Sequence, residues 1–374
     1  MRKTILIAPT EFKGSLSAGE VAEVIGETLQ AKAGDKFEII ERPISDGGDG
    51  FVSTLEKALE VESFNIEVSA PYGNDIFFDV PIAYDRKTNT AFVESAEVLG
   101  LKKVPRENRN PLFLSSRGLG EILRALNKIN ERKEREIKRV IVGLGGTATH
   151  DAGLGAASVF GLRLSRCSRA LPVLPRFFMN ADRITFDKKD FDLNFELEVV
   201  ADVENPLTGQ NGSVEIYAAQ KGANETDKKI LEKGFVNILK RLRISGDGKY
   251  YGAGGGLAFG LHYFFNAKII PAKKFIENYF LKEIEHVSHV VTGEGKLDEQ
   301  TLYGKAPKVV YDYFSARKVS VFFIVGKSEL ESAENFTIIE TVKFYDNEKQ
   351  SVENPKHGLR KAAELLGELI LEEK

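Results

Sequence analysis

A glycine-containing loop near the start of the chain has residue types that suit binding of an anion. The segment from Pro9 to Ser15 carries Lys13 and Gly14 between a predicted strand and a predicted helix. Backbone N–H groups at the start of a helix and a lysine charge together favour a bound phosphate or carboxylate. A P-loop is excluded, because Glu20 stands where that motif requires a lysine. Taken alone, the segment favours a tight turn between strand and helix with an exposed lysine.

A second turn, from Ser45 to Gly50, also follows a predicted strand. It contains Asp46, Gly47 and Gly48. The glycines allow the backbone to approach a ligand. The carboxylates of Asp46 and Asp49, three residues apart, could supply a general base and a Mg²⁺ ligand. The same composition is ordinary for a turn, so its specificity is moderate.

A third loop begins at Gly143, after a predicted buried strand, and contains Gly145, Gly146 and Thr147. Together with Ala148 it matches the relaxed dinucleotide fingerprint, so an NAD(P)-dependent oxidoreductase is an alternative. The acidic strand end expected about twenty residues later in such a protein is missing.

Three hydroxyl or carboxylate side chains in the same loop are more typical of polyphosphate and metal ligands. They are Thr147, Thr149 and Asp151. We interpret His150 as a turn or supporting residue, because a single histidine proves little. The lone Cys167 is interpreted as a small residue in or near a core.

Three later loops carry the remaining candidates. They hold Asp202 and Asn205 after a predicted strand, Gly254 and Gly255 in a glycine run, and Glu294, Asp298 and Lys305 after another strand. Carboxylates at strand ends line clefts in α/β proteins. Each loop alone could serve packing or connection only. Six such loops in one chain favour a ligand site.

The elements that must position these loops are predicted from hydrophobic periodicity. Both ends of the chain alternate buried strands with amphipathic helices, and Ser17 and Glu20 form a capping box. The predicted strands at the ends are 4–8, 37–44, 289–292, 319–325 and 336–342, and the helices follow residue 17 and span 51–59, 306–314 and a segment from about 358. The middle predicts antiparallel hairpins at 64–68, 77–82 and 90–93, a helix over 118–130, and buried strands at 139–142 and 196–200.

The simplest topology is one α/β domain interrupted by another. Residues 1–65 and 285–374 would form a parallel-sheet domain, and residues 66–284 an inserted mixed α/β domain, with boundaries placed within about ten residues. We expect the active site in the cleft between the two.

Composition excludes several classes of protein. The 374 residues are 42% hydrophobic and carry a net charge of -3, which is too little positive charge for a broad nucleic-acid surface. One cysteine cannot form an internal disulfide, and the N-terminus turns polar too soon for a signal peptide. We expect a soluble cytoplasmic protein that binds neither nucleic acid nor membrane. Its oligomeric state stays open, with a homodimer as one option.

The assembled motifs resemble the bacterial glycerate kinase family, of the glycerate 2-kinase type. The resemblance covers essentially the whole chain, and order and spacing both agree. The segments that carry it are 7–9, 12–18, 46–48, 143–146, 202–207, 220–223, 254–257, 292–298 and 304–307. It implies a flavodoxin-like domain interrupted by a second α/β domain, and ATP-dependent phosphorylation of D-glycerate to 2-phosphoglycerate with Mg²⁺.

The chain departs from the family pattern at several positions. The family commonly has Asp-Ser at Thr10 and Glu11, Asn and Gly at His150 and Ala152, and a shorter acidic residue at Glu204. A strand-end aspartate would thereby be lost, so either Glu11 substitutes for it or the substrate differs.

The hypothesis for the site assigns a role to each loop. Lys13, with the N–H groups of Gly14 and Ser15, would bind the γ-phosphate or the glycerate carboxylate, and Asp46 would orient or deprotonate the acceptor hydroxyl. The further substrate or phosphate ligands would be Gly47, Gly48, Asn205, Gly254 and Gly255; the nucleotide ligands Gly145, Gly146, Thr147 and Lys305; and the Mg²⁺ ligands Asp202, Glu294 and Asp298, with Asp202 also catalytic. A non-catalytic binding homologue remains a further alternative, besides the oxidoreductase.

Overall fold

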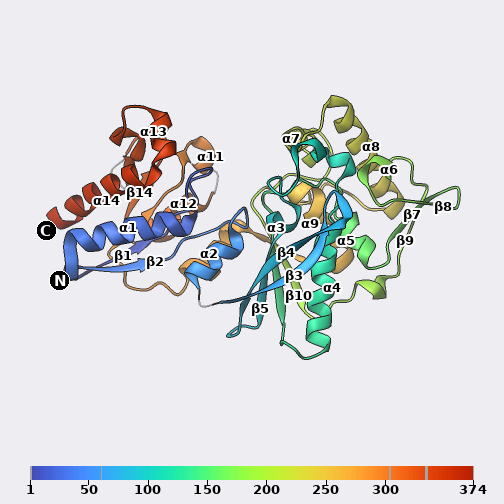
Figure 1. The fold of residues 1–374 in the computed structure, drawn as a ribbon, viewed down its shortest axis with the longest axis horizontal. Helices are drawn as coiled ribbons and strands as arrows, with labels where there is room; N and C mark the ends of the chain where they lie inside the picture. Colours follow the sequence, from blue (N-terminus) through green and yellow to red (C-terminus); the bar gives the residue numbers. More distant parts are fainter. Residues whose placement is uncertain (1, 60, 303–304, 333–335, 374) are drawn as a thin grey trace. The chain divides into compact units, whose positions relative to one another are not determined.

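The chain divides into two compact units, seen in a computed structural model that describes residues 2–59, 61–302, 305–332 and 336–373 (Figure 1). Unit 1 comprises residues 1–46, 53–60 and 272–374, and unit 2 comprises residues 47–52 and 61–271. Each unit is built around its own sheet. Both ends of the chain therefore contribute to unit 1.

Unit 1 contains a five-stranded parallel sheet in the order β16-β14-β12-β1-β2. The strands are β1 (Lys3–Ile7), β2 (Phe37–Glu41), β12 (His289–Thr292), β14 (Ser320–Val325) and β16 (Phe336–Glu340). Numbered along this unit, the order is 2-1-3-4-5, which is the flavodoxin-like arrangement. The predicted fold class is therefore confirmed. The switch point lies between β1 and β12, where the strand order reverses direction.

Helices cover both faces of this sheet (Figure 1). They are α1 (Ala18–Ala33) and α14 (Pro355–Glu372) on one face, and α12 (Ala306–Ser315) on the other, next to α10 (Ala272–Ile276). Phe322 packs with α1 and α14, whereas the ring of Phe323 contacts Tyr311 of α12. Successive strand residues point to opposite faces, so both faces are buried. The capping box of Ser17 and Glu20 is confirmed at the start of α1.

Three shorter elements complete the part of unit 1 that bears on the site. They are α2 (Phe51–Ala58), whose first two residues belong to unit 2, and the parallel pair β13 (Lys296–Leu297) and β15 (Lys327–Ser328). The β13 and β15 pair joins the loops that follow β12 and β14.

Unit 2 contains a six-stranded mixed sheet in chain order. Its strands are β3 (Glu62–Ala70), β4 (Gly73–Asp85), β5 (Thr90–Glu94), β6 (Arg139–Gly143), β10 (Glu196–Ala201) and β11 (Lys268–Pro271). The pairs β3-β4 and β4-β5 are antiparallel, as the hairpin prediction requires, and the remaining pairs are parallel. The carboxyl ends of β5, β6 and β10 consequently lie at one edge of the sheet.

A large hydrophobic core fills much of unit 2, beside a smaller cluster of Val104, Leu114 and Ala148. Its helices include α3 (Ser95–Leu99), α4 (Arg117–Glu131), α5 (Leu154–Val159), α6 (Pro175–Phe178), α7 (Ser213–Tyr217), α8 (Glu225–Leu242) and α9 (Ala253–Phe265). A small antiparallel sheet of β7 (Arg163–Arg166), β8 (Arg169–Leu171) and β9 (Arg183–Thr185) was not predicted.

The placement of Cys167 differs from the prediction. Cys167 is exposed, in the turn between β7 and β8, where it and Ser168 have φ values of +49° and +63°. Such tight turns usually contain asparagine or glycine. The Cys-Ser pair therefore gave no sequence signal of a hairpin, and the expectation of a core position is wrong.

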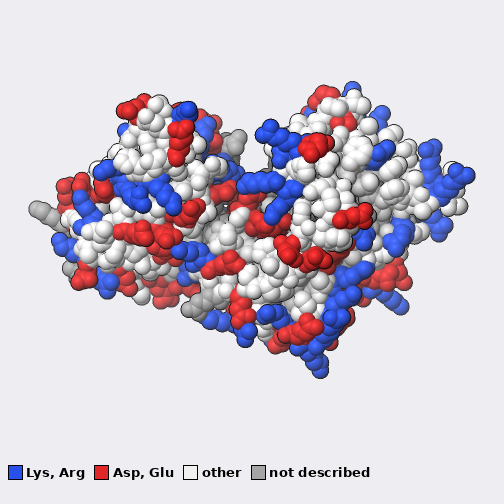
Figure 2. Space-filling model, viewed as in Figure 1, with Lys and Arg blue, Asp and Glu red and all other residues white. Residues whose placement is uncertain are grey.

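Acidic and basic side chains are intermixed over the face shown in Figure 2, in keeping with the net charge of -3. Lys and Arg gather near the end of unit 2 that carries β7 and β8. No helix among the described residues is long and apolar enough to cross a membrane.

Candidate active-site loops

The loops that follow β1 and β12 are joined at the switch point of unit 1. The N–H and Oγ1 of Thr10 donate to Gly293 O at 2.9 and 3.0 Å, and Thr292 Oγ1 donates to Ala8 O at 2.8 Å. Ligands of open α/β sheets bind beyond the carboxyl ends of the strands at such a point. The switch point therefore places both predicted loops where a ligand is expected.

A tight turn presents Lys13 at this point. Phe12 and Leu16 are buried and exchange backbone hydrogen bonds, and Gly14 has φ +81°, which favours glycine. The Lys13 side chain is exposed. The N–H and Oγ of Ser15 both donate to Phe12 O, at 2.8 and 3.0 Å. Because both Ser15 donors are engaged within the turn, the predicted interaction with an anion falls mainly on Lys13.

The loop after β12 is anchored on two sides. Gly326 N donates to Glu294 O and Lys327 N donates to Gly295 O, both at 3.1 Å. A Cβ on Gly295 would lie 3.4 Å from Lys13 N, so this loop packs directly against the Lys13 turn. The backbone next to the Glu294 carboxylate is therefore fixed.

Two carboxylates of this loop share one hydroxyl. Thr301 Oγ1 donates to Glu294 Oε1 at 2.6 Å and lies 3.5 Å from Asp298 Oδ1, which also accepts from Thr301 N at 3.2 Å. Burial raises the pKa of Glu294, while Thr301, Lys305 and Lys13 act in the opposite direction. Lys305 Nζ lies 3.5 Å from Asp298 Oδ1. The structure thus brings Lys13 of the first predicted loop close to Glu294, Asp298 and Lys305, which were predicted together in the last one.

The third predicted Mg²⁺ ligand, Asp202, belongs to unit 2 and is exposed at the end of β10. Within the described ranges, no group of three or more His, Cys, Asp or Glu side chains lies close enough to hold a metal ion. Asp46 belongs to unit 1 and is partly buried. Gly304, part of the last motif, lies outside the described residues.

The predicted nucleotide loop of unit 2 packs against the second predicted turn. Gly145 N donates to Gly47 O at 3.0 Å, and a Cβ on Gly145 would lie 2.4 Å from Gly48 Cα. A Cβ on Gly143 would lie 2.5 Å from Gly47 O. Only glycine permits two backbones to approach this closely. The segments 47–48 and 143–146 are therefore one structural feature.

The glycine run at the start of α9 holds the other side of this loop. Gly254, Gly255 and Gly256 have φ values of +64°, +71° and +86°, so the regular helix begins after them. Gly255 O accepts from Ala152 N at 3.2 Å. A Cβ on Gly255 would lie 2.2 Å from Thr149 O. The run thus fixes the backbone from Thr149 to Ala152.

Replacing Gly255 by alanine is expected to destabilise unit 2 by about 3 kcal/mol, because the new Cβ meets a carbonyl oxygen and the left-handed backbone disfavours a side chain. Urea unfolding measures the change. Gly209→Ala is the matched control: its φ is +96°, but no atom lies within 4 Å of its added Cβ. Equal losses for the two variants would contradict the close contact.

The buried Lys221 contacts two residues of the same loop, Thr147 and Thr149. Lys221 Nζ lies 3.3 Å from Thr147 Oγ1 and donates to Thr149 O at 2.9 Å. Burial lowers the pKa of Lys221 to about 7, and Asp151 opposes this shift only in part. In the sequence, the segment 220–223 is a candidate only because it is one of the segments that carry the family resemblance. No local pattern shows that this lysine is buried.

The lowered pKa of Lys221 should make the free energy of unfolding depend on pH. Between pH 7 and the ordinary lysine pKa, the unfolded chain binds a proton that the folded chain does not. Folding stability from this group therefore increases as pH rises, by about 1.4 kcal/mol per pH unit. Wild type should gain about 2 kcal/mol relative to Lys221→Met between pH 7 and 9, measured by urea unfolding. Parallel pH profiles for the two proteins would contradict the assignment.

Asp151 and His150 have structural roles. Asp151 is fully buried, and its Oδ2 accepts from Ser116 N, Ser116 Oγ and Gly155 N at 2.7, 2.8 and 3.1 Å. The sequence suggested a metal or phosphate ligand here, but these donors occupy the carboxylate. His150 Nε2 lies 3.1 Å from Ser213 Oγ, and burial followed by the charge of Lys221 lowers the pKa of His150 well below its usual value. His150 is therefore a neutral, packed side chain, as interpreted from the sequence.

Asn205 also has its side chain engaged within the protein. Its Nδ2 donates to Asn211 O at 2.9 Å, and its Oδ1 accepts from Tyr217 Oη at 2.7 Å. Asn205 therefore shapes the loop after β10, and the predicted contact with substrate would require one of these bonds to break.

Sequence reasoning missed Glu94. This buried residue ends β5 opposite Gly143, and its carboxylate accepts from Gly50 N at 2.8 Å and Val52 N at 3.1 Å. Burial raises the pKa of Glu94 to about 7. Glu94 thus fixes the end of the 45–50 turn. A glutamate at the end of a buried strand was the available signal, and it is a weak one.

The chain matches a known protein family over nearly its whole length. The model of the Glycerate kinase family matches residues 5–371. The chain belongs to this family. The prediction made from the motifs is confirmed, and neither the oxidoreductase nor the non-catalytic alternative is favoured.

Individual glycerate kinases show the same extent of similarity. Glycerate kinase from Neisseria meningitidis serogroup B is 33% identical over 312 residues, covering 81% of this chain and 80% of the relative. Glycerate 2-kinase from Escherichia coli K12 is 33% identical over 326 residues, covering 81% and 80%. The solved structure of a protein assigned as glycerate kinase 2 from Salmonella typhimurium LT2 has a TM-score of 0.77 and 26% identity, covering 99% and 98%. A kinase family implies ATP as the phosphoryl donor.

Proposed function

We propose that this member of the glycerate kinase family transfers the γ-phosphoryl group of ATP to D-glycerate, forming 2-phosphoglycerate. The family match over residues 5–371 carries the proposal. The grouping of Lys13, Glu294, Asp298 and Lys305 at the switch point supports it, because these residue types can bind an anionic substrate and a metal.

Phosphoryl transfer depends on positioning and on cancellation of charge more than on covalent chemistry by the protein. Lys13 would bind the γ-phosphate or the glycerate carboxylate. Lys305 lies beside Asp298 and would reach a second phosphate oxygen. Both lysines have flexible side chains that can follow the charge as it moves during transfer.

The residues of this loop fit Mg²⁺ as the metal. Glu294 and Asp298 offer carboxylate oxygens, which Mg²⁺ prefers, and Thr301 holds both carboxylates close to one hydroxyl. Burial raises the pKa of Glu294, so a nearby cation would be favoured electrostatically. When bound, Mg²⁺ would neutralise charge on the phosphate oxygens. Asp202 stays a predicted Mg²⁺ ligand.

In unit 2 we assign the phosphate chain of ATP to the loop formed by Gly145, Gly146 and Thr147. The close backbone approach of 47–48 and the left-handed run at Gly254 and Gly255 hold this loop in shape. The buried Lys221 fixes the position of this loop through its contacts with Thr147 Oγ1 and Thr149 O.

Asp46 is our candidate for orienting or deprotonating the acceptor hydroxyl. The proposal assigns residues of both units to the binding of ATP and glycerate.

The experiment is a coupled ADP-release assay with Mg-ATP and a panel of acceptors: D-glycerate, L-glycerate, glycolate, lactate, tartronate and glycerol. The proposal predicts release that depends on D-glycerate. If ADP is released only with another acid, that acid would be the substrate. If folded, ATP-binding protein releases no ADP with any acceptor of the panel, the proposal is overturned.

A further inference from the structure

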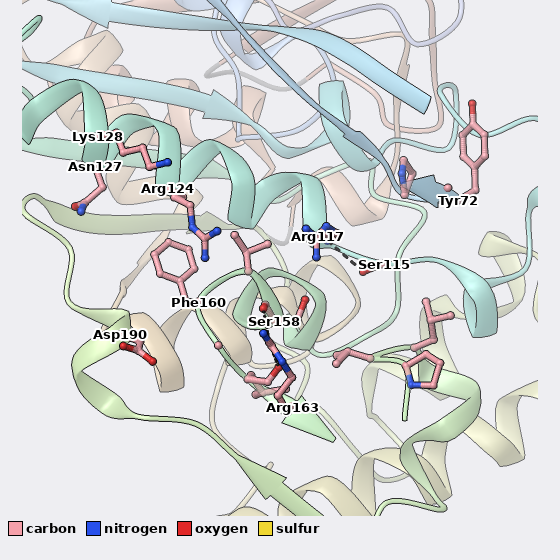
Figure 3. Close-up of a pocket in the computed structure, with 18 of the residues that line it drawn as sticks. Tyr72, Ser115, Arg117, Arg124, Asn127, Lys128, Ser158, Phe160, Arg163 and Asp190 are labelled. Atoms are coloured by element: carbon pink, nitrogen blue, oxygen red, sulfur yellow. Dashed lines mark hydrogen bonds between the residues drawn. The ribbon is translucent and has the colours of Figure 1, made fainter. Parts of the chain in front are cut away.

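A cavity lies within unit 2, and none of the predicted site residues lines it (Figure 3). Its volume is about 960 Å³, and one wall is the α4 helix while another is the end of α5 with the segment that leads into β7. Sites for small molecules in proteins have volumes of roughly 300–1,000 Å³. The cavity is therefore large enough for a ligand of several functional groups.

Basic side chains from α4 face this cavity. Arg117, Arg124 and Lys128 lie along one stripe of the helix, and Figure 3 shows Arg124 between Lys128 and Phe160. The Arg124 guanidinium lies 5.3 Å from the centre of the Phe160 ring, which holds it in place. Arg117 is paired with Glu121 at 2.8 Å, so Arg124 and Lys128 are the cations best placed for an anion.

Three carboxylates also line the cavity. They are Glu131, Asp190 and Asp192. Glu131 accepts from Asn127 Nδ2 at 2.9 Å. Figure 3 shows Asp190 on the other side of the Phe160 ring from α4. A ligand that satisfies both sets of charges needs an oxyanion for the α4 cations and hydroxyl donors for the carboxylates.

The electrostatic surroundings favour entry of an anion. Arg163 lines the cavity at the start of β7, and Arg166 and Arg169 are exposed on the same small sheet. Figure 2 shows the concentration of basic side chains near β7 and β8. Clusters of one sign raise the local concentration of the opposite ion.

Both helical walls of the cavity begin at the same buried carboxylate. Asp151 Oδ2 accepts from Ser116 N, just before α4, and from Gly155 N at the start of α5. Asp151 also ends the loop that contains Thr147. A ligand that moves α4 relative to α5 would therefore act on the proposed nucleotide loop through Asp151.

We propose that this cavity is an effector site for a sugar phosphate, meaning a phosphorylated polyhydroxy compound. Its phosphate binds Arg124 and Lys128, and its hydroxyls donate to Asp190 and Asp192. Occupancy changes the affinity for ATP through Asp151. The coupling rests on the proposed function, whereas the binding does not.

The exposed Cys167 in the turn after β7 provides a reporter for binding. The full chain is labelled there with an environment-sensitive fluorophore and titrated with ribose 5-phosphate and glucose 6-phosphate, and separately with ribose and inorganic phosphate. We expect a saturable change in fluorescence with at least one sugar phosphate at millimolar concentration or below. Ribose alone and inorganic phosphate alone should each give a weaker change. The site is overturned if neither sugar phosphate changes the fluorescence, or if inorganic phosphate alone binds as tightly as a sugar phosphate.

Variants locate the response. Arg124→Gln with Lys128→Gln should weaken binding at least tenfold, whereas the charge-matched control Arg132→Gln with Lys138→Gln, which changes exposed residues outside the cavity, should not. Lys13→Ala should leave the fluorescence response intact, which separates this site from the proposed catalytic one. Equal loss in the control pair, or loss in Lys13→Ala, overturns the assignment.

Enzyme assays test the coupling. A saturating sugar phosphate should change KM for ATP about fivefold or more in wild type and not in the Arg124 and Lys128 double variant. An unchanged KM in wild type at saturation overturns the effector role. Failure of the kinase assay itself would count against the proposed function while leaving the binding result intact.

Discussion

Replacing Lys13 by alanine should lower kcat/KM for glycerate phosphorylation about 10³-fold, with an unchanged Tm. The lysine side chain is exposed on a turn that Phe12 and Leu16 hold closed, so its removal leaves the packing intact. Loss of a charge that stabilises the transferred group typically costs 10²–10³ in rate. Steady-state kinetics and a thermal melt measure both quantities.

Lys36→Ala is the matched control for this prediction. Lys36 is an exposed lysine of the same unit, in the turn between α1 and β2. Its removal changes net charge equally and should leave kcat/KM within twofold of wild type. Normal turnover by Lys13→Ala, with a normal melt, would remove Lys13 from the mechanism.

Glu294→Gln should lower kcat/KM about 10²-fold or more while Tm stays equal or rises. Glutamine keeps an oxygen that can accept from Thr301 Oγ1, but it removes the charge that would bind Mg²⁺. Burial raises the pKa of Glu294, so the ionised carboxylate is a cost to folding near neutral pH. The variant should also need a higher Mg²⁺ concentration for half-maximal activity.

Glu299→Gln supplies the comparison, because Glu299 is an exposed carboxylate in the same loop region. It should behave as wild type in both rate and Mg²⁺ dependence. If Glu294→Gln instead lost stability and activity together and kept the wild-type Mg²⁺ dependence, Glu294 would be a structural residue.

Much of the fold could be predicted because local signals were strong. The capping box of Ser17 and Glu20 opens α1, and β12 has the predicted bounds. The hairpins of β3, β4 and β5 follow from alternating patterns. The strand order of unit 1 came from the family resemblance, because periodicity predicts strands and not their neighbours.

The parts that sequence reasoning missed depend on contacts between distant segments. Lys221 is buried because the glycine run at 254–256 and the loop at 147–152 close around it. Glu94 meets the 47–52 segment more than forty residues away. Ser15 and Asn205 have the residue types of a ligand site, yet neighbouring groups already engage their side chains. Residue type and spacing alone do not reveal such partners.

The central claim is tested most directly by phosphorus NMR of the products formed from Mg-ATP and D-glycerate. In 2-phosphoglycerate the phosphate is attached to a CH carbon, so its proton-coupled signal is a doublet, whereas a phosphate on a CH₂ carbon gives a triplet. We predict that a new doublet grows as the ATP γ-phosphate signal falls, with no such signal from L-glycerate. A triplet would contradict phosphorylation of the 2-hydroxyl, and growth of inorganic phosphate alone would contradict phosphoryl transfer to glycerate.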